Sequence, residues 1–309
     1  MSELDLATLE KLGAMTREIR KEVSLMPIKG MEITELVDFV EKKIFDAGYL
    51  PAFPCTVSVN DVAAHYTVFD EGEHILAKGD LIKIDFGISE NGFITDNAVC
   101  LEIETDKYKD LMAANLEGLN AVMDLIKVGT TMEELGECVN DVAKKYGYNT
   151  IHNLCGHQIA QNNLHCGLSV PNFKNGDKRK VEENMEFAIE PFFTPGEPRV
   201  KSCGGSNILH LQDAKPVRDP IAKKVLDFIK ENYPHLPFSK RWLLKDVRIR
   251  LGLEGGFEKR KVLYALKVLK MQKIIYEYDA LATVDGSYVS QYEDAVVFAQ
   301  GKKSIITRL

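Results

Sequence analysis

The feature that most constrains the fold of this chain is a local pattern that recurs 99 residues later. Gly30, Glu35 and Tyr49 return in the same order as Gly129, Glu134 and Tyr148. In both copies a helix is predicted before the glycine, at about 4–24 and about 106–127, and an amphipathic helix after it. Thr131 and Glu134 form a capping box at the start of the later helix. The shared order favours a duplicated helix–helix–strands unit over a chance match, with a site along the seam between two halves.

The second half is interrupted by a segment of different character. Residues 214–273 contain 16 Lys and Arg but only six Asp and Glu, and their apolar residues have helical spacing. We expect a main domain of residues 1–205 and 276–309, and an inserted helical subdomain of residues 206–275. Two interpretations of the positive charge stay open. It is either a solvated face or a surface for transient contact with RNA, such as the ribosome.

Composition and motifs exclude several classes of protein. The net charge of −7 gives no general argument for a nucleic-acid binder. No apolar run approaches the ~20 residues that a membrane helix needs, and the N-terminal segment lacks the features of a signal peptide. The six cysteines are scattered and form no CxxC pair, which favours free thiols over a structural zinc site. We therefore expect a cytoplasmic protein without a membrane segment.

Two aspartates interrupt the apolar strands of KIDFGISENGFITDNAVC, at Asp85 and Asp96. A loop centred between Glu90 and Asn91 would pair them directly, whereas a tight Asn91–Gly92 turn would make them diagonal neighbours. Either register places both carboxylates on one face of the hairpin. Two buried like charges need a cation or a shared proton, although an inserted Arg or Lys stays an alternative.

Similar polar residues occur in three other apolar segments. Glu190 lies in MEFAIEPFF, Glu293 lies in QYEDAVVF, and His157 follows Gly156, which permits a close approach. We expect both glutamates to lie within strands. Four carboxylates and one imidazole suit Mn, Fe, Co or Zn. Their charge favours two divalent ions, with a bridging hydroxide as the nucleophile.

Two further histidines, His65 and His165, lie outside this ligand set. A lone histidine is more often a hydrogen-bonded structural group than a catalyst. Both residues, however, have apolar or small neighbours, which suits a side chain that faces a substrate. Both interpretations stay open on the residues alone.

The ordered set of motifs resembles one known family. AAHYT, KIDFG with GFITDNAV, GHQI, LHCG, FAIEPF and SQYEDAVVF follow one another over nearly the whole chain. In this order and spacing the chain resembles the type 2 methionine aminopeptidases of peptidase family M24, in the short form typical of archaea. The resemblance implies an α+β pita-bread (creatinase/aminopeptidase) fold of two pseudo-symmetric halves with an inserted, winged-helix-like helical subdomain. The 103 residues from Glu190 to Glu293 hold this insert, which type 1 enzymes lack.

The resemblance also implies a role for each candidate residue. The expected ligands of two divalent metal ions are Asp85, Asp96, His157, Glu190 and Glu293. Glu190 would also shuttle protons, and His65 and His165 would contact the substrate, with His165 stabilising the tetrahedral oxyanion. The specificity pocket would draw on Phe53, Leu164 and Tyr278. Such a monomer would remove the initiator methionine from nascent proteins with a small second residue, by hydroxide attack on the first peptide bond.

Two departures from the family pattern leave every ligand in place. Val68 stands where a proline usually follows AAHYT, and Asp294 follows Glu293 where many eukaryotic members have histidine.

Two other functions use the same fold. A prolidase or aminopeptidase P usually carries a large extra N-terminal domain and different histidine motifs. A non-catalytic relative that binds RNA or proteins is expected to have lost several ligands.

Overall fold

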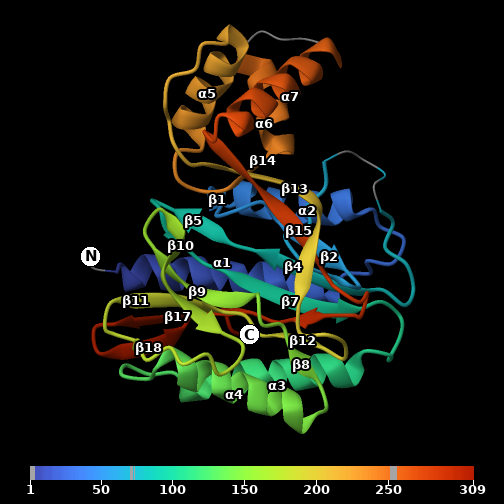
Figure 1. Cartoon of the computed structure of the whole chain (residues 1–309), viewed down its shortest axis with the longest axis vertical. Coiled ribbons are helices and arrows are strands. Elements are labelled where there is room, and N and C mark those ends of the chain that lie inside the picture. The colour runs from blue at the N-terminus through green and yellow to red at the C-terminus, as the bar shows by residue number, and fades with distance from the viewer. Residues whose placement is uncertain (1–3, 70–71, 73, 251–255) are drawn as a thin grey trace.

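The computed structural model of the chain describes residues 4–69, 72, 74–250 and 256–309 (Figure 1). Its helices are α1 (Leu6–Leu25), α2 (Ile33–Asp46), α3 (Lys109–Leu125), α4 (Met132–Lys145), α5 (Pro220–Asn232), α6 (Lys240–Arg250) and α7 (Gly256–Met271). Helices and mainly antiparallel sheets alternate along the chain, so the predicted α+β class is confirmed.

The described strands form five small sheets. In the first half these are β2 (Thr56–Val59), β4 (Leu81–Phe86) and β7 (Asn97–Glu102), and then β1 (Leu50–Pro51), β5 (Ile88–Glu90) and β6 (Phe93–Ile94). A five-stranded sheet has the order β10 (Asn163–Pro171), β9 (Cys155–Ala160), β11 (Met185–Ile189), β17 (Asp294–Ala299) and β18 (Lys302–Ile305). The other two are β16 (Ser290–Gln291), β12 (Phe192–Thr194) and β8 (Asn149–Thr150), and β14 (Phe238–Ser239), β13 (Val200–Leu211), β15 (Ile275–Thr283) and β3 (Val62–Ala64).

The elements repeat at the offset that the sequence predicts. The bounds of α2 and α4 differ by 99 residues at both ends, as do those of β1 and β8. The glycines before these helices, Gly30 and Gly129, have φ of 82° and 94°, a region that glycine adopts without steric cost. The capping box is also confirmed, because Glu134 N donates to Thr131 Oγ1 and Thr131 N donates to Glu134 Oε2. The chain is therefore built from two copies of one unit.

The two copies share one apolar core. Equivalent positions of α2 and α4 are buried in it, for example Leu36 with Leu135 and Val40 with Val139. Neither copy covers its own apolar face, so burial of this surface holds the halves together and fixes the seam between them.

The hairpin with the two aspartates is more broken than the sequence suggests. Glu90 pairs with Phe93 across an Asn91–Gly92 turn, so the tight-turn register is the right one. The hairpin bends at Gly87, where a Cβ would lie 2.2 Å from Thr95 O, and four strands replace the expected two.

The four acidic residues do not all lie within strands. Asp85 lies in β4 as expected, but Asp96 lies between β6 and β7. Glu190 follows the end of β11 and Glu293 precedes β17, so the expectation that these residues lie within strands is wrong. Three of the four acidic residues therefore lie next to strand ends, and only Asp85 lies within a strand.

Helices α5, α6 and α7 lie beyond the end of the β13–β15 hairpin, at the top of Figure 1. They enclose a hydrophobic cluster of their own, which includes Phe228, Leu243 and Val262. At the base of α6, Arg241 Nη2 and Trp242 Nε1 both donate to Glu41 Oε2 in α2, at 2.8 and 2.7 Å. The bounds of an inserted subdomain at 206–275 stay a prediction.

Two observations concern the environment of the chain. None of the described helices is long and apolar enough to cross a bilayer. All six cysteines are free thiols, in agreement with their scattered positions in the sequence.

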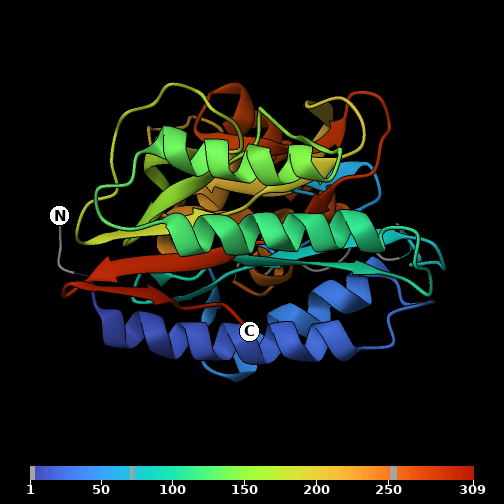
Figure 2. The same cartoon turned by 90° about the horizontal axis from the view of Figure 1, so that it is seen from below.

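Helix α1 packs on the C-terminal segment, which runs beside it in Figure 2. A Cβ on Gly13 would lie only 2.2 Å from Ile306 O. We therefore predict that Gly13→Ala destabilises the protein, although Ala favours helices over Gly by about 1 kcal/mol. The backbone must move, and a loss of about 2 kcal/mol or more in the free energy of unfolding is expected in urea denaturation.

The matched control is Ala14→Gly at the neighbouring exposed position, which should cost only the helix propensity of about 1 kcal/mol. A Gly13→Ala protein as stable as the wild type would contradict the close packing of α1 on the C-terminal segment.

Candidate metal centre

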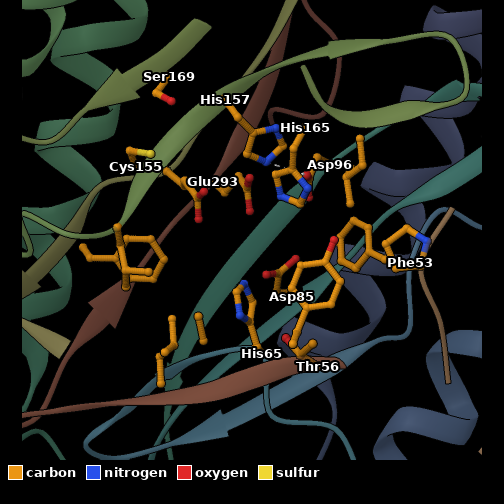
Figure 3. A pocket seen from close by; sticks show the side chains of 18 of the residues that line it. Phe53, Thr56, His65, Asp85, Asp96, Cys155, His157, His165, Ser169 and Glu293 are labelled. Carbon is orange, nitrogen blue, oxygen red and sulfur yellow. Dashed lines mark ion pairs between the residues drawn. The ribbon is translucent and has the colours of Figure 1, made fainter. Parts of the chain in front are cut away.

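The sequence-predicted site residues all line one cavity of about 470 Å³ (Figure 3). They are Phe53, His65, Asp85, Asp96, His157, Leu164, His165, Glu190, Tyr278 and Glu293. Residues from both halves of the chain meet here, so the cavity lies on the predicted seam.

The first half supplies Asp85 and Asp96. In the tight-turn register Asp85 pairs with Ala98, which makes Asp96 its diagonal neighbour. On its other side Asp85 pairs with Thr56 of β2. Because side chains alternate along paired strands, this register directs both carboxylates to the same side of the hairpin.

The second half supplies the imidazole and the two glutamates. His157 in β9 pairs with Ala188 in β11, and Gly156 allows this approach because a Cβ there would lie 2.4 Å from Ala188 O. Glu293 is joined to the first half through its backbone. Its N–H donates to Ala98 O at 3.1 Å, and its carbonyl oxygen accepts from Ala98 N at 3.4 Å. This bridge brings Glu293 next to the aspartates.

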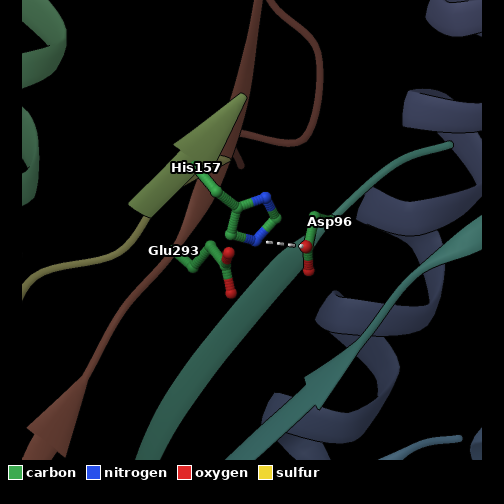
Figure 4. A group of neighbouring side chains, drawn as sticks. All are labelled: Asp96, His157 and Glu293. Carbon is green, nitrogen blue, oxygen red and sulfur yellow. Dashed lines mark ion pairs between the residues drawn. The ribbon is translucent and has the colours of Figure 1, made fainter. Parts of the chain in front are cut away.

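Three side chains converge most closely (Figure 4). Asp96, His157 and Glu293 each present a ligand atom, and these atoms lie within 4.8 Å of one another. His157 Nε2 lies 3.4 Å from Asp96 Oδ2. One oxygen or nitrogen ligand from each of three chain segments fits a small divalent cation.

The polar atoms of the site lack protein partners. Among the described residues, Asp85 Oδ1, Glu293 Oε2 and His157 Nδ1 are buried without a hydrogen bond. A buried polar atom without a partner is costly, and a bound cation would supply one to the carboxylate oxygens. The donor set therefore fits a metal.

The pKa values of these groups also indicate a site that fits a metal. Burial raises the pKa of Asp96 to about 8. Burial, followed by repulsion from Asp96, raises the pKa of Asp85 well above its usual range, and burial with repulsion among the carboxylates does the same to Glu190 and Glu293. Burial lowers the pKa of His157 to about 4, so its imidazole is neutral and free to ligate. A divalent cation removes the cost of ionising the carboxyls.

Sequence analysis missed two residues that orient these ligands. Gln291 Nε2 donates to Glu190 Oε2 at 3.2 Å, which holds this carboxyl in place. Asn172 Nδ2 donates to the Glu190 carbonyl oxygen at 3.3 Å. Gln291 carried a sequence signal, because it is a polar residue two positions before Glu293 in an apolar segment. Asn172 carried none.

The two histidines outside the ligand set both face the cavity. His65 Nδ1 lies 3.2 Å from Asp279 O, and its φ is 68°, a backbone conformation that non-glycine residues rarely adopt. The ring centroids of His165 and His157 lie 4.2 Å apart. His165 is exposed to solvent. Burial lowers the pKa of both His65 and His165, so both are neutral near pH 7.

The apolar wall of the cavity contains the predicted specificity residues. Phe53 and Leu164 are buried side by side in one small cluster, and Tyr278 packs edge-on against His65. Pro237 also lines the cavity, and its neighbour Leu236 packs against the Phe53 cluster. Both lie in the segment between α5 and α6. No local pattern in the sequence indicates this contact, because it depends on how that segment folds back.

Comparison with known proteins agrees with the fold. The sequence profile of metallopeptidase family M24 matches residues 7–213. The methionine aminopeptidase of Thermococcus onnurineus is 35% identical over 94% of this chain and 95% of its own length. That of Methanothermobacter thermautotrophicus is 33% identical over 96% and 97%.

Solved structures of low sequence identity share the fold. A thermophilic Arx1 superposes with a TM-score of 0.80 at 15% identity over 97% of this chain and 90% of its own. The methionine aminopeptidase of Rickettsia prowazekii does so with a TM-score of 0.67 at 17% identity, over 98% and 97%. The pita-bread architecture is thereby confirmed.

The chain belongs to metallopeptidase family M24, and within it to the methionine aminopeptidases of the archaeal, type 2-like group. Family membership implies a divalent metal, and Asp96, His157 and Glu293 form the candidate site for it.

The raised carboxyl pKa values predict an unusual pH dependence for the metal-free protein. A carboxyl whose pKa is higher in the folded state keeps its proton in a pH range where the unfolded chain has lost it. Stability therefore falls as pH rises from about 4 to about 8, the window set by Asp96. In chelator we expect a lower melting temperature at pH 8 than at pH 5.

The matched variant is Asp96→Asn, which removes the titration of Asp96 and should make the fall in stability with pH shallower. A wild-type profile that is flat, or that rises with pH relative to Asp96→Asn, would contradict the proposed clustering of carboxyls.

Proposed function

We propose that this protein removes the initiator methionine from proteins whose second residue is small, with two divalent cations held by Asp85, Asp96, His157, Glu190 and Glu293. The observation that carries the proposal is the convergence of these five side chains in one cavity, beside an apolar wall and two neutral histidines. The archaeal relatives support the choice of methionine.

The charge of the site supports two cations rather than one. Four carboxyl groups line the cavity, and each is buried or half-buried. Two divalent ions would balance four carboxylates, whereas one would leave two carboxylates in excess at a place with little access to water. When bound, such cations supply a Lewis acid for the scissile carbonyl and lower the pKa of the attacking water. Mn, Fe, Co and Zn all suit these ligands.

Glu190 is the proposed proton carrier. Its Oε2 accepts a hydrogen bond from Gln291, which fixes the carboxyl at the edge of the cavity. Burial and the neighbouring aspartates raise its pKa, which favours a carboxyl that accepts a proton from water and returns it to the leaving amine. Gln291 holds the geometry through this exchange, because its amide does not titrate.

The two histidines are proposed to bind the peptide bond that is cut. A carbonyl oxygen only accepts, so the contact between His65 Nδ1 and Asp279 O places the proton on Nδ1 and leaves Nε2 as an acceptor for a substrate N–H. A neutral His165 has one N–H to donate to the oxygen of the scissile amide. This bond would strengthen as negative charge develops on that oxygen.

The methionine side chain would lie against Phe53, Leu164 and Tyr278. These side chains offer an apolar and aromatic surface, on which an unbranched thioether packs well. A β-branched or charged first residue would fit such a surface poorly. The free α-amino group would then lie near the carboxylates of the metal site, as an exopeptidase requires.

Peptide substrates distinguish this function from the alternatives. After chelation and reloading with Mn, Fe, Co or Zn, we predict release of methionine from Met-Ala-Ser at a rate at least about 100-fold above that from Met-Leu or Xaa-Pro peptides. Liquid chromatography of the products measures this. Glu293→Ala serves as the inactive control.

Rapid cleavage of Xaa-Pro peptides with inert Met-Ala-Ser would instead indicate a prolidase. Inactivity on every peptide with each of the four metals would favour a non-catalytic protein.

The winged-helix-like insert and its contact with the ribosome stay predictions. Its exposed basic residues include Lys223 and Lys224 on α5, and Arg260 and Lys267 on one face of α7. Phosphate contacts would make any binding sensitive to salt. We predict that Arg260→Glu with Lys267→Glu weakens co-sedimentation with ribosomes at low salt by about tenfold.

Lys127→Glu with Lys144→Glu, near α3 and α4 at the bottom of Figure 1, is the control with the same change in net charge. Equal binding by both double variants would leave the basic face as a solvated surface.

A further inference from the structure

A buried ion pair lies directly behind the metal site, and none of the proposed catalytic steps uses it. Arg20 of α1 donates from Nη1 to Asp294 Oδ1 at 2.6 Å, and both side chains are at least 94% buried. Asp294 is the residue after Glu293. A buried ion pair is seldom more stabilising than apolar residues of the same size, so its use here points to a need for position rather than for stability.

The C-terminal segment completes the arrangement. Thr307, which is fully buried, donates from Oγ1 to Asp294 Oδ1 at 3.0 Å and accepts from Ala295 N at 2.8 Å. Ile306 N also donates to Ala295 O at 3.0 Å. The two residues that follow Glu293 are therefore held by side-chain and backbone bonds from the C-terminal segment.

Arg20 reaches Glu293 itself, but at the backbone. Its Nη1 lies 3.3 Å from the Glu293 carbonyl oxygen, the oxygen that also accepts from Ala98 N across the seam. At the carboxyl, by contrast, the buried Glu293 Oε2 has no hydrogen-bond partner among the described residues. The direction of this carboxyl therefore depends on where its backbone is held.

We propose that Arg20, Asp294 and Thr307 form a clamp that positions Glu293 for metal binding, so that the two ends of the chain tune the affinity of the site. The clamp joins α1, the start of β17 and the C-terminal segment through the side chains of Arg20, Asp294 and Thr307. The proposal rests on the metal-ligating role of Glu293 given above. Residues that orient a metal ligand typically change affinity by 10–100-fold when they are replaced.

The test measures metal affinity and does not require turnover. Full-length protein is stripped with chelator, and the Kd for Co²⁺ is measured by calorimetry alongside the melting temperature of the metal-free form. Thr307→Val keeps the shape of the side chain and removes both of its hydrogen bonds, and Asp294→Asn removes the charge. We expect each to weaken Co²⁺ binding about tenfold. Thr307→Ser, which keeps the hydroxyl, should bind as the wild type does.

A second buried ion pair provides the control for a general loss of stability. Glu41→Gln removes the buried carboxylate that pairs with Arg241 between α2 and α6, far along the chain from Glu293. It should lower the melting temperature while leaving the Kd for Co²⁺ unchanged. Clamp variants that lower only the melting temperature, as this control does, would overturn the proposal. If Asp294→Asn does not fold, Thr307→Val and Thr307→Ser decide the question.

Glu293→Ala distinguishes a failure of the proposed clamp from a failure of the proposed metal site. If this variant binds Co²⁺ as tightly as the wild type, Glu293 is not a ligand and the proposed metal site itself is wrong. If Glu293→Ala weakens binding and Thr307→Val does not, only the clamp is wrong. Thr307→Val should have no further effect on the Kd in the Glu293→Ala background, because the clamp acts through that residue.

Discussion

Repulsion among buried carboxylates is the constraint around which the rest of this structure is arranged. Asp85 and Asp96 come from one half of the chain, and Glu190 and Glu293 come from the other. Burial raises the pKa values of all four, and repulsion from neighbouring carboxyls adds to this for Asp85, Glu190 and Glu293. Among the described residues, Asp85 Oδ1 and Glu293 Oε2 are buried without a hydrogen-bond partner. A site of this kind is costly without a cation and favourable with one. Metal binding therefore offsets the free-energy cost of placing these carboxylates together in a buried site.

The duplicated architecture explains how such a site is assembled. Each half brings its own helix pair and strands, and one shared apolar core holds the halves in a fixed relation. The site lies where strands of the two halves meet, and the Ala98–Glu293 backbone bridge crosses the seam there. Because the core fixes the halves, the carboxyls remain close together despite their repulsion. Stability of the core and affinity of the site are thus linked.

Much of this arrangement was predictable from the sequence, and the rest depends on tertiary contacts. The four acidic residues could be identified because each lies in an apolar segment, and a buried carboxylate is costly without a partner. They are Asp85, Asp96, Glu190 and Glu293. Periodicity placed the helices within a few residues. The bend at Gly87 was not predictable, because it depends on the close approach of Thr95 O, in the link between β6 and β7. The contributions of Pro237 to the cavity and of Arg20 to Glu293 likewise join segments far apart in the sequence, and no local pattern signals them.

The central claim is that these five residues from two halves hold two divalent cations. Anomalous diffraction from a crystal of the cobalt-loaded protein, collected at the Co absorption edge, tests it most directly. The account predicts two anomalous peaks inside the cavity, one of them in contact with Asp96, His157 and Glu293. A single peak would contradict the pair of cations, and peaks outside the cavity would contradict the site.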